Sequence, residues 1–411
     1  MILEFYFQSC PMSEVFAIGL MSGTSLDGVD GVLLRTDGSV GNQPHMQLCH
    51  VYMPYPQTLQ TSLRTLCQEN NEMSGFQILT IEKEITRIHA QVVQQILEKS
   101  QKDKKEIEVI GFHGQTILHR PQDGITWQIG DGALLSELTG ISVVNNFRVR
   151  DMAAGGQGAP VLPVYHAALA GHLLKNLATQ THASLAESLQ GSSLCILNLG
   201  GVANVTHIAF PENEGEARLV AFDTGPGNAL MNDWMNAHTN QPYDQNGEVA
   251  RGGQLLEPLL AEWTGAGEVS RYLKEQPPKS LDRNTFASVL QHLDQAEATT
   301  ADGCRTLLEM SIACIQQCRT LLDPPPAVWL VTGGGRKNEF FMERLKESLS
   351  PAVVYPVEAV GWDGDMLEAE GMAFLAVRCL RKLPLTFPTT TACREPVTGG
   401  TIHFHSERLE T

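Results

Sequence analysis

Two short segments rich in glycine and small hydroxyl residues interrupt apolar runs, one in each half of the chain. The first lies within residues 18–30 and reads Ser-Gly-Thr-Ser-Leu-Asp-Gly at its centre, and the second lies within residues 195–206 around Gly200 and Gly201. Glycine permits close backbone approach, so successive N–H groups can converge on an anion, and Thr24 and Ser25 add hydroxyl donors. Each segment alone also fits an ordinary β-hairpin. Together they predict a duplicated fold with nucleotide held between the copies.

One carboxylate, Asp223, stands at the end of an apolar segment and directly before Thr-Gly-Pro-Gly227. An aspartate at a strand end beside such a loop is rigidly aimed, which suits proton abstraction from a hydroxyl group or a water molecule. Capping the helix that follows Gly227 is the alternative role for this residue type. The residues by themselves leave both roles open.

Seven segments, in the same order and over nearly the whole chain, resemble the anhydro-N-acetylmuramic acid kinase family. They are residues 19–28, 112–116 (Phe-His-Gly-Gln-Thr), 147–160 (ending Gly-Gly-Gln-Gly-Ala-Pro), 198–204, 222–228 (Phe-Asp-Thr-Gly-Pro-Gly-Asn), 333–335 (Gly-Gly-Gly) and 370–374 (Glu-Gly-Met-Ala-Phe). This family belongs to the superfamily of acetate and sugar kinases, actin and heat-shock chaperones. The resemblance implies an α/β fold of two ribonuclease-H-like (actin-like ATPase) domains, with nucleotide and sugar in the interdomain cleft.

The resemblance also implies a reaction for Asp223. In the family, the matching aspartate takes a proton from the water that attacks C1 of a 1,6-anhydro sugar, and the freed O6 attacks the γ-phosphorus of ATP. The expected products are N-acetylmuramate 6-phosphate and ADP, in cell-wall sugar recycling. One carboxylate would thus serve both hydrolysis and phosphoryl transfer.

ATP and Mg²⁺ are the expected cofactors, although the chain contains no Gly-x-x-x-x-Gly-Lys-Ser/Thr motif of a P-loop kinase. The resemblance assigns ATP to three segments: Gly23, Thr24, Ser25, Leu26, Asp27, Gly28, Val29 and Asp30; Gly200 and Gly201; and Gly333, Gly334 and Gly335 with Asn338. Asp27 is a candidate to hold Mg²⁺ through water, because magnesium keeps most of its water ligands. A hydrogen bond within its own turn is the alternative for Asp27.

The residues expected to bind the sugar are Thr116, Arg150, Asp151 and Glu370. Arg150 offers a fork of donors for a carboxylate such as a lactyl group, and Asp151 can accept from sugar hydroxyls. A surface ion pair is the alternative for Arg150, and a solvent-facing side chain is the alternative for Glu370. His113 is expected to order its Gly-Gln-Thr turn rather than to bind substrate.

Two departures from the family pattern leave the sugar open. Asn146 stands where the family usually has Asp, and the segment before Glu370 lacks the usual Pro and Trp-Met context. Another 1,6-anhydrosugar, such as levoglucosan, is therefore the second candidate substrate. A non-catalytic, actin-like nucleotide-binding module is the alternative of another class.

The elements expected around these residues follow one order twice. In the first half, strands flank the glycine turn, a third strand spans residues 46–55, and residues 78–99 place apolar side chains at spacings of three and four, as in a helix packed on a sheet. In the second half, three strands end near Asp223. A meander followed by alternating helices and strands is typical of a ribonuclease-H-like domain. Asp131, which also ends a strand before a helix, is expected to match Asp223.

We expect two domains, formed by residues 13–150 with about 375–406, and by residues 151–374. A polar stretch at 173–193 is expected to be a surface loop or a partly disordered insert. The final long helix, at 366–380, would lead the chain back to the first domain.

Composition narrows the partners. The formal net charge of −17 repels nucleic acid, and no apolar run reaches the roughly 18 residues of a membrane span. The nine cysteines show no paired metal spacing, and Cys314 and Cys318 are expected in the core. Together with a start that lacks the pattern of a signal peptide, this predicts a cytoplasmic protein, with residues 1–12 a loose extension. The oligomeric state is left open, with a homodimer as one alternative.

Overall fold

The computed structural model describes residues 12–40, 45–68, 71–177, 193–210 and 218–405. The chain forms two compact units, Met1–Lys175 with Met366–Thr411, and Asn176–Asp365. The first unit is thus made of two chain segments. Its limits lie at residues 175 and 366, whereas the sequence places them at 150 and about 375. Most of the predicted 173–193 insert, and residues 1–11, lie outside the described residues.

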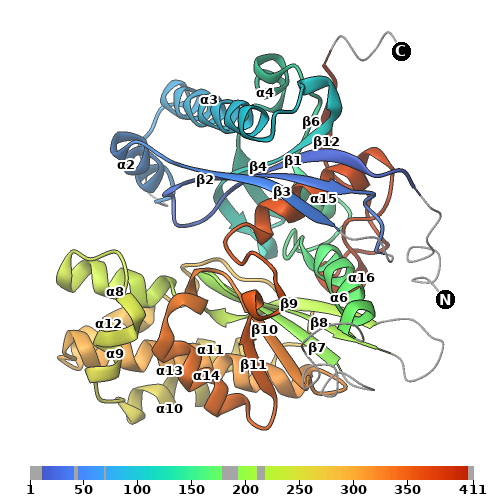
Figure 1. The fold of residues 1–411 in the computed structure, drawn as a ribbon. Helices are drawn as coiled ribbons and strands as arrows, with labels where there is room; N and C mark the ends of the chain where they lie inside the picture. The colour runs from blue at the N-terminus through green and yellow to red at the C-terminus, as the bar shows by residue number, and fades with distance from the viewer. Residues whose placement is uncertain (1–11, 41–44, 69–70, 178–192, 211–217, 406–411) are drawn as a thin grey trace. The chain divides into compact units, whose positions relative to one another are not determined.

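The sheet of the first unit has seven strands, in the order β12-β6-β4-β1-β2-β3 with β5 paired to β4. The strands are β1 (Val15–Ser22), β2 (Gly28–Thr36), β3 (Met46–Pro54), β4 (Ile107–Arg120), β5 (Ile125–Ile129), β6 (Val143–Asn145) and β12 (Thr401–His403). Strands β1, β2 and β3 form an antiparallel meander, while β4 lies parallel to both β1 and β6. Figure 1 labels β1, β2, β3, β4, β6 and β12 of this sheet.

The sheet of the second unit repeats this arrangement with five strands, in the order β11-β10-β7-β8-β9. They are β7 (Ser193–Leu199), β8 (Val202–Ala209), β9 (Arg218–Pro226), β10 (Val328–Thr332) and β11 (Val353–Pro356). Again the first three strands form an antiparallel meander, and the other two lie parallel to the first. The order and direction match β6-β4-β1-β2-β3, which confirms the predicted duplication.

The expected equivalence of Asp131 and Asp223 is wrong. Asp223 lies in β9, the third strand of its meander, and the counterpart of β9 in the first unit is β3. Asp131 instead follows β5, a strand added to β4, and its carboxylate caps helix α4 by accepting from the N–H of Leu134 at 2.9 Å. The strand predicted before Asp131 is present as β5, but its hairpin with β4 has no strand counterpart among the described residues of the second sheet.

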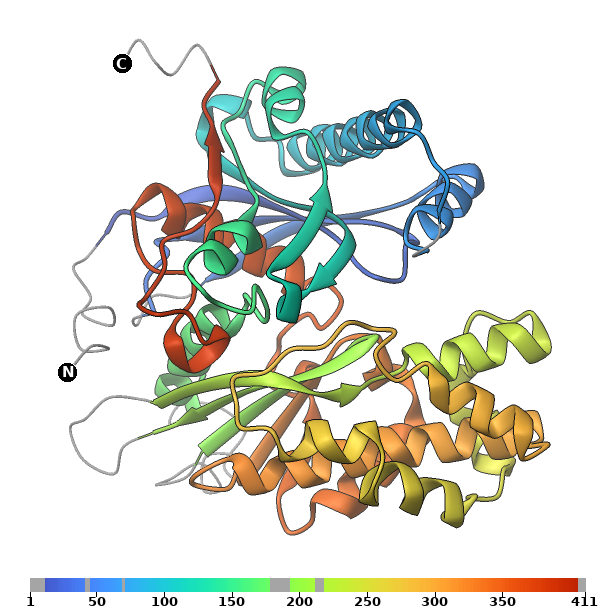
Figure 2. The same cartoon turned by 180° about the vertical axis from the view of Figure 1, so that it is seen from behind.

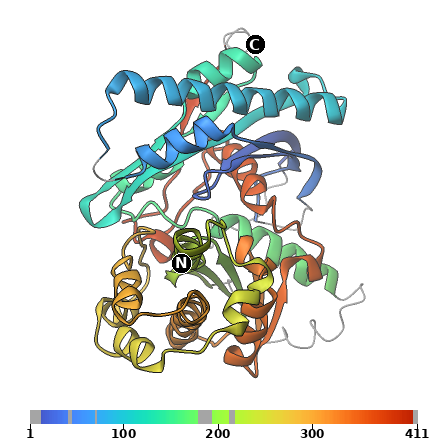
Figure 3. The ribbon, with the colours of Figure 1, turned by 90° about the vertical axis from the view of Figure 1, so that its left-hand side faces the viewer.

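Helices cover both faces of the first sheet. The helices described in this part of the chain are α2 (Gln57–Leu66), α3 (Gly75–Ser100), α4 (Gly132–Thr139), α5 (Phe147–Ala153), α6 (Pro163–Leu177), α15 (Leu367–Leu380) and α16 (Pro388–Thr391). On one face, the predicted stripe of α3 is buried with α2 and β1 in one apolar core, and Figure 3 shows these two helices side by side. On the other face, α15 packs against β1, β2 and β4. This packing places the whole of α15 in the first unit.

The second unit has one apolar core between its sheet and a layer of helices (Figure 2). The helices are α8 (Ala229–Thr239), α9 (Glu248–Gly252), α10 (Glu257–Gly265), α11 (Glu268–Lys274), α12 (Ser288–Gln295), α13 (Thr300–Cys318) and α14 (Glu339–Leu349). Cys314 and Cys318 are free thiols in this core, as predicted. Within the described ranges, no helix combines the length and apolar character needed to cross a lipid bilayer.

Candidate active site

Each glycine turn lies at the carboxyl ends of the parallel strands of its own sheet. In the first unit, the segment 23–27 joins β1 to β2, and Ser22 pairs with Gln115 of β4. In the second unit, Gly200 and Gly201 join β7 to β8, and Gly333 follows β10, which is parallel to β7. In open α/β sheets, ligands bind outside these strand ends. The residues 23–27 of the first unit, and Gly200, Gly201 and Gly333 of the second, therefore lie at the edge of their own sheet where ligands are expected.

The turn of the first unit exposes polar groups to solvent. Thr24, Ser25 and Asp27 are exposed, and Ser25 donates a hydrogen bond from Oγ to Oδ1 of Asp27 at 2.5 Å. Asp27 thus makes the hydrogen bond within the turn that was its alternative role. Because its carboxylate is exposed beside two hydroxyl groups, it also fits a Mg²⁺ ion held through water. Val29 is buried and Asp30 half-buried in β2.

The tip of this turn carries backbone strain. The backbone of Leu26 has a φ of +58°, which residues other than glycine and asparagine rarely adopt. The leucine side chain is only 6% exposed and belongs to the apolar core. Strain of this kind persists where the surrounding structure fixes the residue, and it is common at ligand sites. The buried leucine therefore anchors a turn whose flanking hydroxyls face solvent.

The glycines of the second unit form a close-packed group within that unit. The carbonyls of Gly200 and Gly201 accept from the N–H groups of Asn228 and Gly227 at 2.9 Å, which joins the turn to the start of α8. Gly333 has a φ of +79°, and a Cβ there would lie 2.2 Å from Oδ1 of Asn198. Only glycine fits that position, so the backbone after β10 lies directly against the end of β7.

Gly334 and Gly335 begin a 3-10 helix, Gly334–Lys337, and Asn338 follows it. A Cβ on Gly334 would meet only the amide of Asn228, at 3.9 Å, whereas one on Gly335 would lie 2.8 Å from Cβ of Leu199. Asn338 is buried and caps α14, since its Oδ1 accepts from the N–H of Phe341 at 2.9 Å. The open backbone of Gly334 is thus the part of this segment that a ligand could approach.

Asp223 is 5% exposed and lies inside β9, three residues before the strand ends. Its Oδ2 accepts from the N–H of Leu281 at 2.7 Å, its own N–H donates to the carbonyl of Lys279 at 2.9 Å, and its carbonyl accepts from the hydroxyl of Tyr272 at 2.6 Å. Helix α8 begins with Asn228 at its N-cap, so Asp223 does not cap it. The alternative role from the sequence is wrong.

The N–H of Leu281 holds the carboxylate of Asp223, while Lys279 and the α11 residue Tyr272 hold its backbone. Lys279 is buried, and its ammonium group donates to the carbonyl of Tyr272 at 2.7 Å, at the end of α11. A cation suits the negative end of a helix dipole. Burial, more than the charge of Asp223, raises the pKa of Tyr272 far above its usual value, so this hydroxyl remains a donor.

Thr116 and Arg150 lie on different elements of the first unit. Thr116 is half-buried in β4, beside the Gln115 that pairs with Ser22, and its Oγ1 accepts from Nε2 of Gln128 at 3.4 Å. Arg150 is exposed on α5, and its side chain has no ion pair with any residue that the structure describes. The surface ion pair considered for Arg150 is therefore not formed, which leaves its guanidinium available to a ligand.

Asp151, in contrast, is 1% exposed and already accepts three hydrogen bonds. The donors are the N–H of Gly158 at 2.7 Å and the hydroxyls of Thr386 and Thr391 at 2.5 and 2.7 Å. A Cβ on Gly156 would lie 2.2 Å from this carboxylate. Asp151 thus joins the Gly-Gln-Gly segment to the C-terminal part of the first unit.

Glu370 is 6% exposed, so the solvent-facing alternative is wrong. It lies in the first turn of α15 and accepts a hydrogen bond from the hydroxyl of Tyr165 at 2.6 Å. Burial, with the charge of Glu370 as a second cause, raises the pKa of Tyr165 well above its usual value, which keeps the tyrosine a donor. The carboxylate is thereby held in one orientation.

His113 has the ordering role expected of it. Its Nδ1 lies 2.8 Å from the carbonyl of Gly114, and its Nε2 accepts from Nε of Arg148 at 3.1 Å. Burial, and then the charge of Arg148, lowers the pKa of His113 to about 3. The neutral ring thus links its own turn to α5, the helix that carries Arg150.

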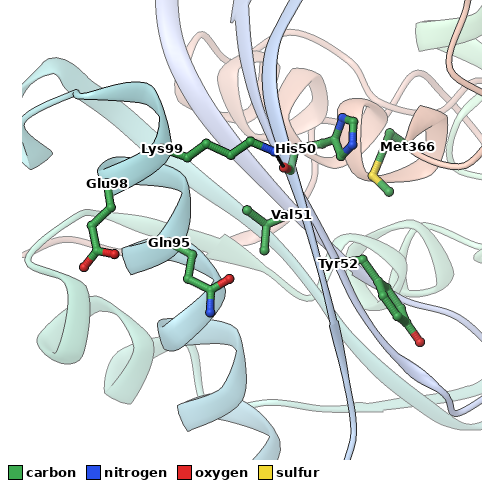
Figure 4. Close-up of a pocket in the computed structure, with 7 residues that line it drawn as sticks. All are labelled: His50, Val51, Tyr52, Gln95, Glu98, Lys99 and Met366. Atoms are coloured by element: carbon green, nitrogen blue, oxygen red, sulfur yellow. Dashed lines mark hydrogen bonds between the residues drawn. The ribbon is translucent and has the colours of Figure 1, made fainter.

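A pocket elsewhere on the first unit contains none of the predicted residues. It is lined by residues 50–52 of β3, by Gln95, Glu98 and Lys99 of α3, and by Met366, and Lys99 donates to the carbonyl of His50 at 2.9 Å (Figure 4). Within the described chain, no group of three or more His, Cys, Asp or Glu side chains could hold a metal ion.

The sequence missed four residues that lie beneath the 23–27 turn: Ser22, Tyr55, His89 and Gln115. Ser22 had a signal in the sequence because it begins the Ser-Gly-Thr-Ser-Leu-Asp-Gly segment, and so did Gln115 of the Gly-Gln-Thr motif. Nε2 of Gln115 donates to the carbonyl of Gly23 at 3.0 Å. The other three come from β1, from the residue after β3 and from α3, so no local pattern connects them.

Two ribonuclease-H-like units, each with a glycine turn at the carboxyl edge of its sheet, define a duplicated actin-like ATPase fold. A family model described as anhydro-N-acetylmuramic acid kinase matches residues 15–405. The chain belongs to this family, as the sequence resemblance predicted.

Curated relatives agree with this assignment. The chain is 43% identical to the anhydro-N-acetylmuramic acid kinase of Rhodospirillum rubrum, over 94% of both chains. It is also 43% identical to that of Paramagnetospirillum magneticum, over 95% of this chain and 99% of the relative. Among solved structures, a ligand-bound xylulose kinase from Lactobacillus acidophilus aligns with a TM-score of 0.39 at 12% identity, covering 96% of this chain and 94% of the kinase.

Proposed function

We propose that this chain is an ATP-dependent kinase that hydrolytically opens 1,6-anhydro-N-acetylmuramic acid and phosphorylates O6. The products are N-acetylmuramate 6-phosphate and ADP. Membership of the family, with relatives of that name at 43% identity, supports the reaction. The observation that carries the proposal for this chain is the rigidly held carboxylate of Asp223 at the edge of the second sheet.

Asp223 is the general base in this proposal. It takes a proton from a water molecule whose oxygen forms a bond to C1 of the sugar, and the C1–O6 bond breaks. O6 then forms a bond to the γ-phosphorus of ATP, and ADP leaves. The hydrogen bond from the N–H of Leu281 to Oδ2 fixes the orientation of the carboxylate. A general base needs this fixed orientation, because proton transfer depends on the geometry of the reacting groups.

The exposed donors of residues 23–30 and the backbone of Gly200, Gly201 and Gly333–Gly335 are proposed to bind ATP. Phosphoryl transfer depends on positioning and on neutralising charge, and successive N–H groups provide both. Asp27 would hold Mg²⁺ through water, and the ion would neutralise phosphate charge. Because Asn338 caps α14, it supports the adenosine side through the segment it fixes.

For the sugar, we propose Arg150 as the partner of the lactyl carboxylate and Thr116 and Glu370 as partners of hydroxyl or amide groups. Arg150 is exposed and fits this role without rearrangement. Asp151 already has three protein donors, so we assign it to holding residues 156–158 rather than to a direct sugar contact. Levoglucosan lacks the lactyl acid and remains the second candidate, because Asn146 replaces the usual Asp.

An ADP-release assay with both sugars tests the substrate. We expect turnover of the muramic sugar, and a rise in its KM of at least tenfold in Arg150→Ala, because a charge-assisted hydrogen bond is lost. The levoglucosan KM should not change in that variant. Turnover of levoglucosan without turnover of the muramic sugar would reverse our assignment.

The catalytic assignment predicts that Asp223→Asn keeps nucleotide binding but loses nearly all turnover, since the amide cannot accept the proton. The loss should reach at least a hundredfold, as is usual for a general base. Calorimetry with ADP and the ADP-release assay measure the two properties. Asp323→Asn, which changes an aspartate of the second unit whose side chain is 89% exposed, is the control and should retain turnover.

A non-catalytic nucleotide-binding module would give the opposite result, with ATP bound by the wild type and no ADP released on any anhydrosugar.

We further propose that the enzyme is cytoplasmic and acts on a small-molecule substrate. The eight cysteines that the structure describes are all free thiols, which fits a reducing compartment. A homodimer is an open alternative that light scattering can test.

A further inference from the structure

A chain of buried hydrogen bonds lies directly beneath the 23–27 turn. Ser22, the residue before the turn, is 1% exposed, and its Oγ lies 2.6 Å from the hydroxyl of Tyr55 and 3.1 Å from Nε2 of His89. Nδ1 of His89 lies 2.7 Å from the carbonyl of Ile85, in the preceding turn of α3. Three elements of the first unit therefore meet at Ser22.

The direction of each bond follows from the chemistry of the groups. A carbonyl only accepts, so Nδ1 of His89 carries the proton. Burial lowers the pKa of His89 to about 4, so the ring is neutral and its Nε2 accepts from the Ser22 hydroxyl. The oxygen of Ser22 then accepts from Tyr55, whose pKa burial raises above its usual value. Each donor in this series of hydrogen bonds is used once, so the bonds can run in only one direction, from Tyr55 through Ser22 and His89 to the carbonyl of Ile85.

The same residues hold both ends of the turn. The N–H of Tyr55 donates to the carbonyl of Asp27 at 2.8 Å, so Tyr55 contacts the end of the turn through its backbone and the start through its hydroxyl. Gln115 holds the start as well, at the carbonyl of Gly23. Between these points Leu26 sits at a φ of +58°. A strained turn needs such restraints, because otherwise it relaxes toward conformations with lower backbone energy.

We propose that Tyr55, Ser22 and His89 are positioning residues for the nucleotide: their buried hydrogen bonds hold residues 23–27 in the conformation that binds the phosphates of ATP. This inference rests on the proposed function of that turn. A preorganised loop binds more tightly because less ordering is needed on binding. Among the described residues, none of the hydrogen bonds of these three side chains reaches Thr116, Arg150 or Glu370, so the network should set the affinity for ATP and leave the affinity for the sugar largely unaffected.

Two substitutions each remove one oxygen from this chain: Tyr55→Phe, which keeps the buried ring, and Ser22→Ala. Tyr243→Phe is the control for the loss of a tyrosine hydroxyl, since Tyr243 lies in the second unit and is 56% exposed. Steady-state kinetics with both substrates, calorimetry with ADP and hydrogen exchange of residues 23–27 measure the effect. Exchange needs neither substrate nor turnover, so it tests the restraint even if the enzyme acts on another sugar.

We expect the KM for ATP and the Kd for ADP to rise about five- to tenfold in both variants, the loss of roughly one buried hydrogen bond. The KM for the sugar and kcat should stay within about twofold, and exchange in residues 23–27 should quicken. Tyr243→Phe should change none of these. An unchanged ATP KM with unchanged exchange, or an equal rise in both KM values, would refute the role. A wild-type enzyme without turnover of the sugar would refute the proposed function, but it would leave the restraint of residues 23–27 to be judged by hydrogen exchange.

Discussion

Asp151 shows how burial changes the interpretation of a residue. Its position after Arg150 suggested a contact with sugar hydroxyls, whereas its three donors show a carboxylate used inside the first unit. Glu370 differs in the other direction, because a glutamate at a helix start is usually exposed and this one is buried against Tyr165. Residue type and motif gave the positions, but burial depends on elements far away in the sequence.

Replacing Asp151 separates the two roles. Asp151→Asn exchanges an acceptor for an NH₂ donor facing groups that also donate, so we expect unfolding free energy to fall by about 1–3 kcal/mol. Thr391→Val removes one of the donors without touching the carboxylate and should shift stability in the same direction. Thermal unfolding and the sugar KM of both variants provide the measurement. A raised sugar KM in Asp151→Asn at wild-type stability would instead favour direct binding.

At the scale of elements, helix α15 depends on two glycines in the strands beneath it. A Cβ on Gly19 of β1 would lie 1.8 Å from the carbonyl oxygen of Ala369, and one on Gly111 of β4 would lie 2.0 Å from that of Met372. Both contacts are with helix backbone, which cannot move without separating α15 from the sheet. The missing side chains are therefore what allows this close packing.

Gly19→Ala or Gly111→Ala should lower the free energy of unfolding by about 3 kcal/mol or more, because the added methyl group would overlap helix backbone that cannot shift without disrupting the packing of α15. Gly75→Ala is the control, since a Cβ at the start of α3 would have no heavy atom within 4 Å. Its effect should stay within about 0.5 kcal/mol. Denaturant titration of the three variants measures this, and equal stability of all three would contradict the packing argument.

The sequence predicted the elements with strong local patterns. Alternating apolar residues predicted the strands of the meanders, and apolar residues at helical spacing predicted α3. The predicted bounds of these elements lie close to the bounds in the structure. Short strands such as β11 and β12 were missed, because four or three residues carry no periodicity and their pairing with β10 and β6 is decided by the rest of the sheet. The same reason hid the Ser22 network, whose members come from three separate elements.

At the scale of the whole molecule, neutral buried histidines are unevenly divided. Burial is the main cause that lowers the pKa of five described histidines of the first unit to about 3 or 4: His45, His89, His113, His119 and His166. In the described part of the second unit, His207 has its pKa lowered to about 4. The ordinary value in an unfolded chain is about 6.5.

A lowered folded pKa means that the unfolded state binds protons first, so stability is present above about pH 6.5 and is lost as the pH falls toward 4. The first unit should lose more than the second. Hydrogen exchange at pH 7, 6 and 5, corrected for the intrinsic rate, should show local opening free energies falling faster in β1, β2 and β4 than in β7 and β8. Parallel losses in both units would show that these histidines do not govern acid stability.

The interruption of the first unit by residues 176–365 also has a consequence for synthesis. On the ribosome, every strand of the later unit has been made before α15 and β12 exist, while the earlier unit still lacks the helix that covers one face of its sheet. The part of the chain that begins first is thus the last to be completed. Until residues 367–380 have emerged, Gly19 and Gly111 face no helix, and the nascent protein carries an uncovered sheet that a chaperone could recognise.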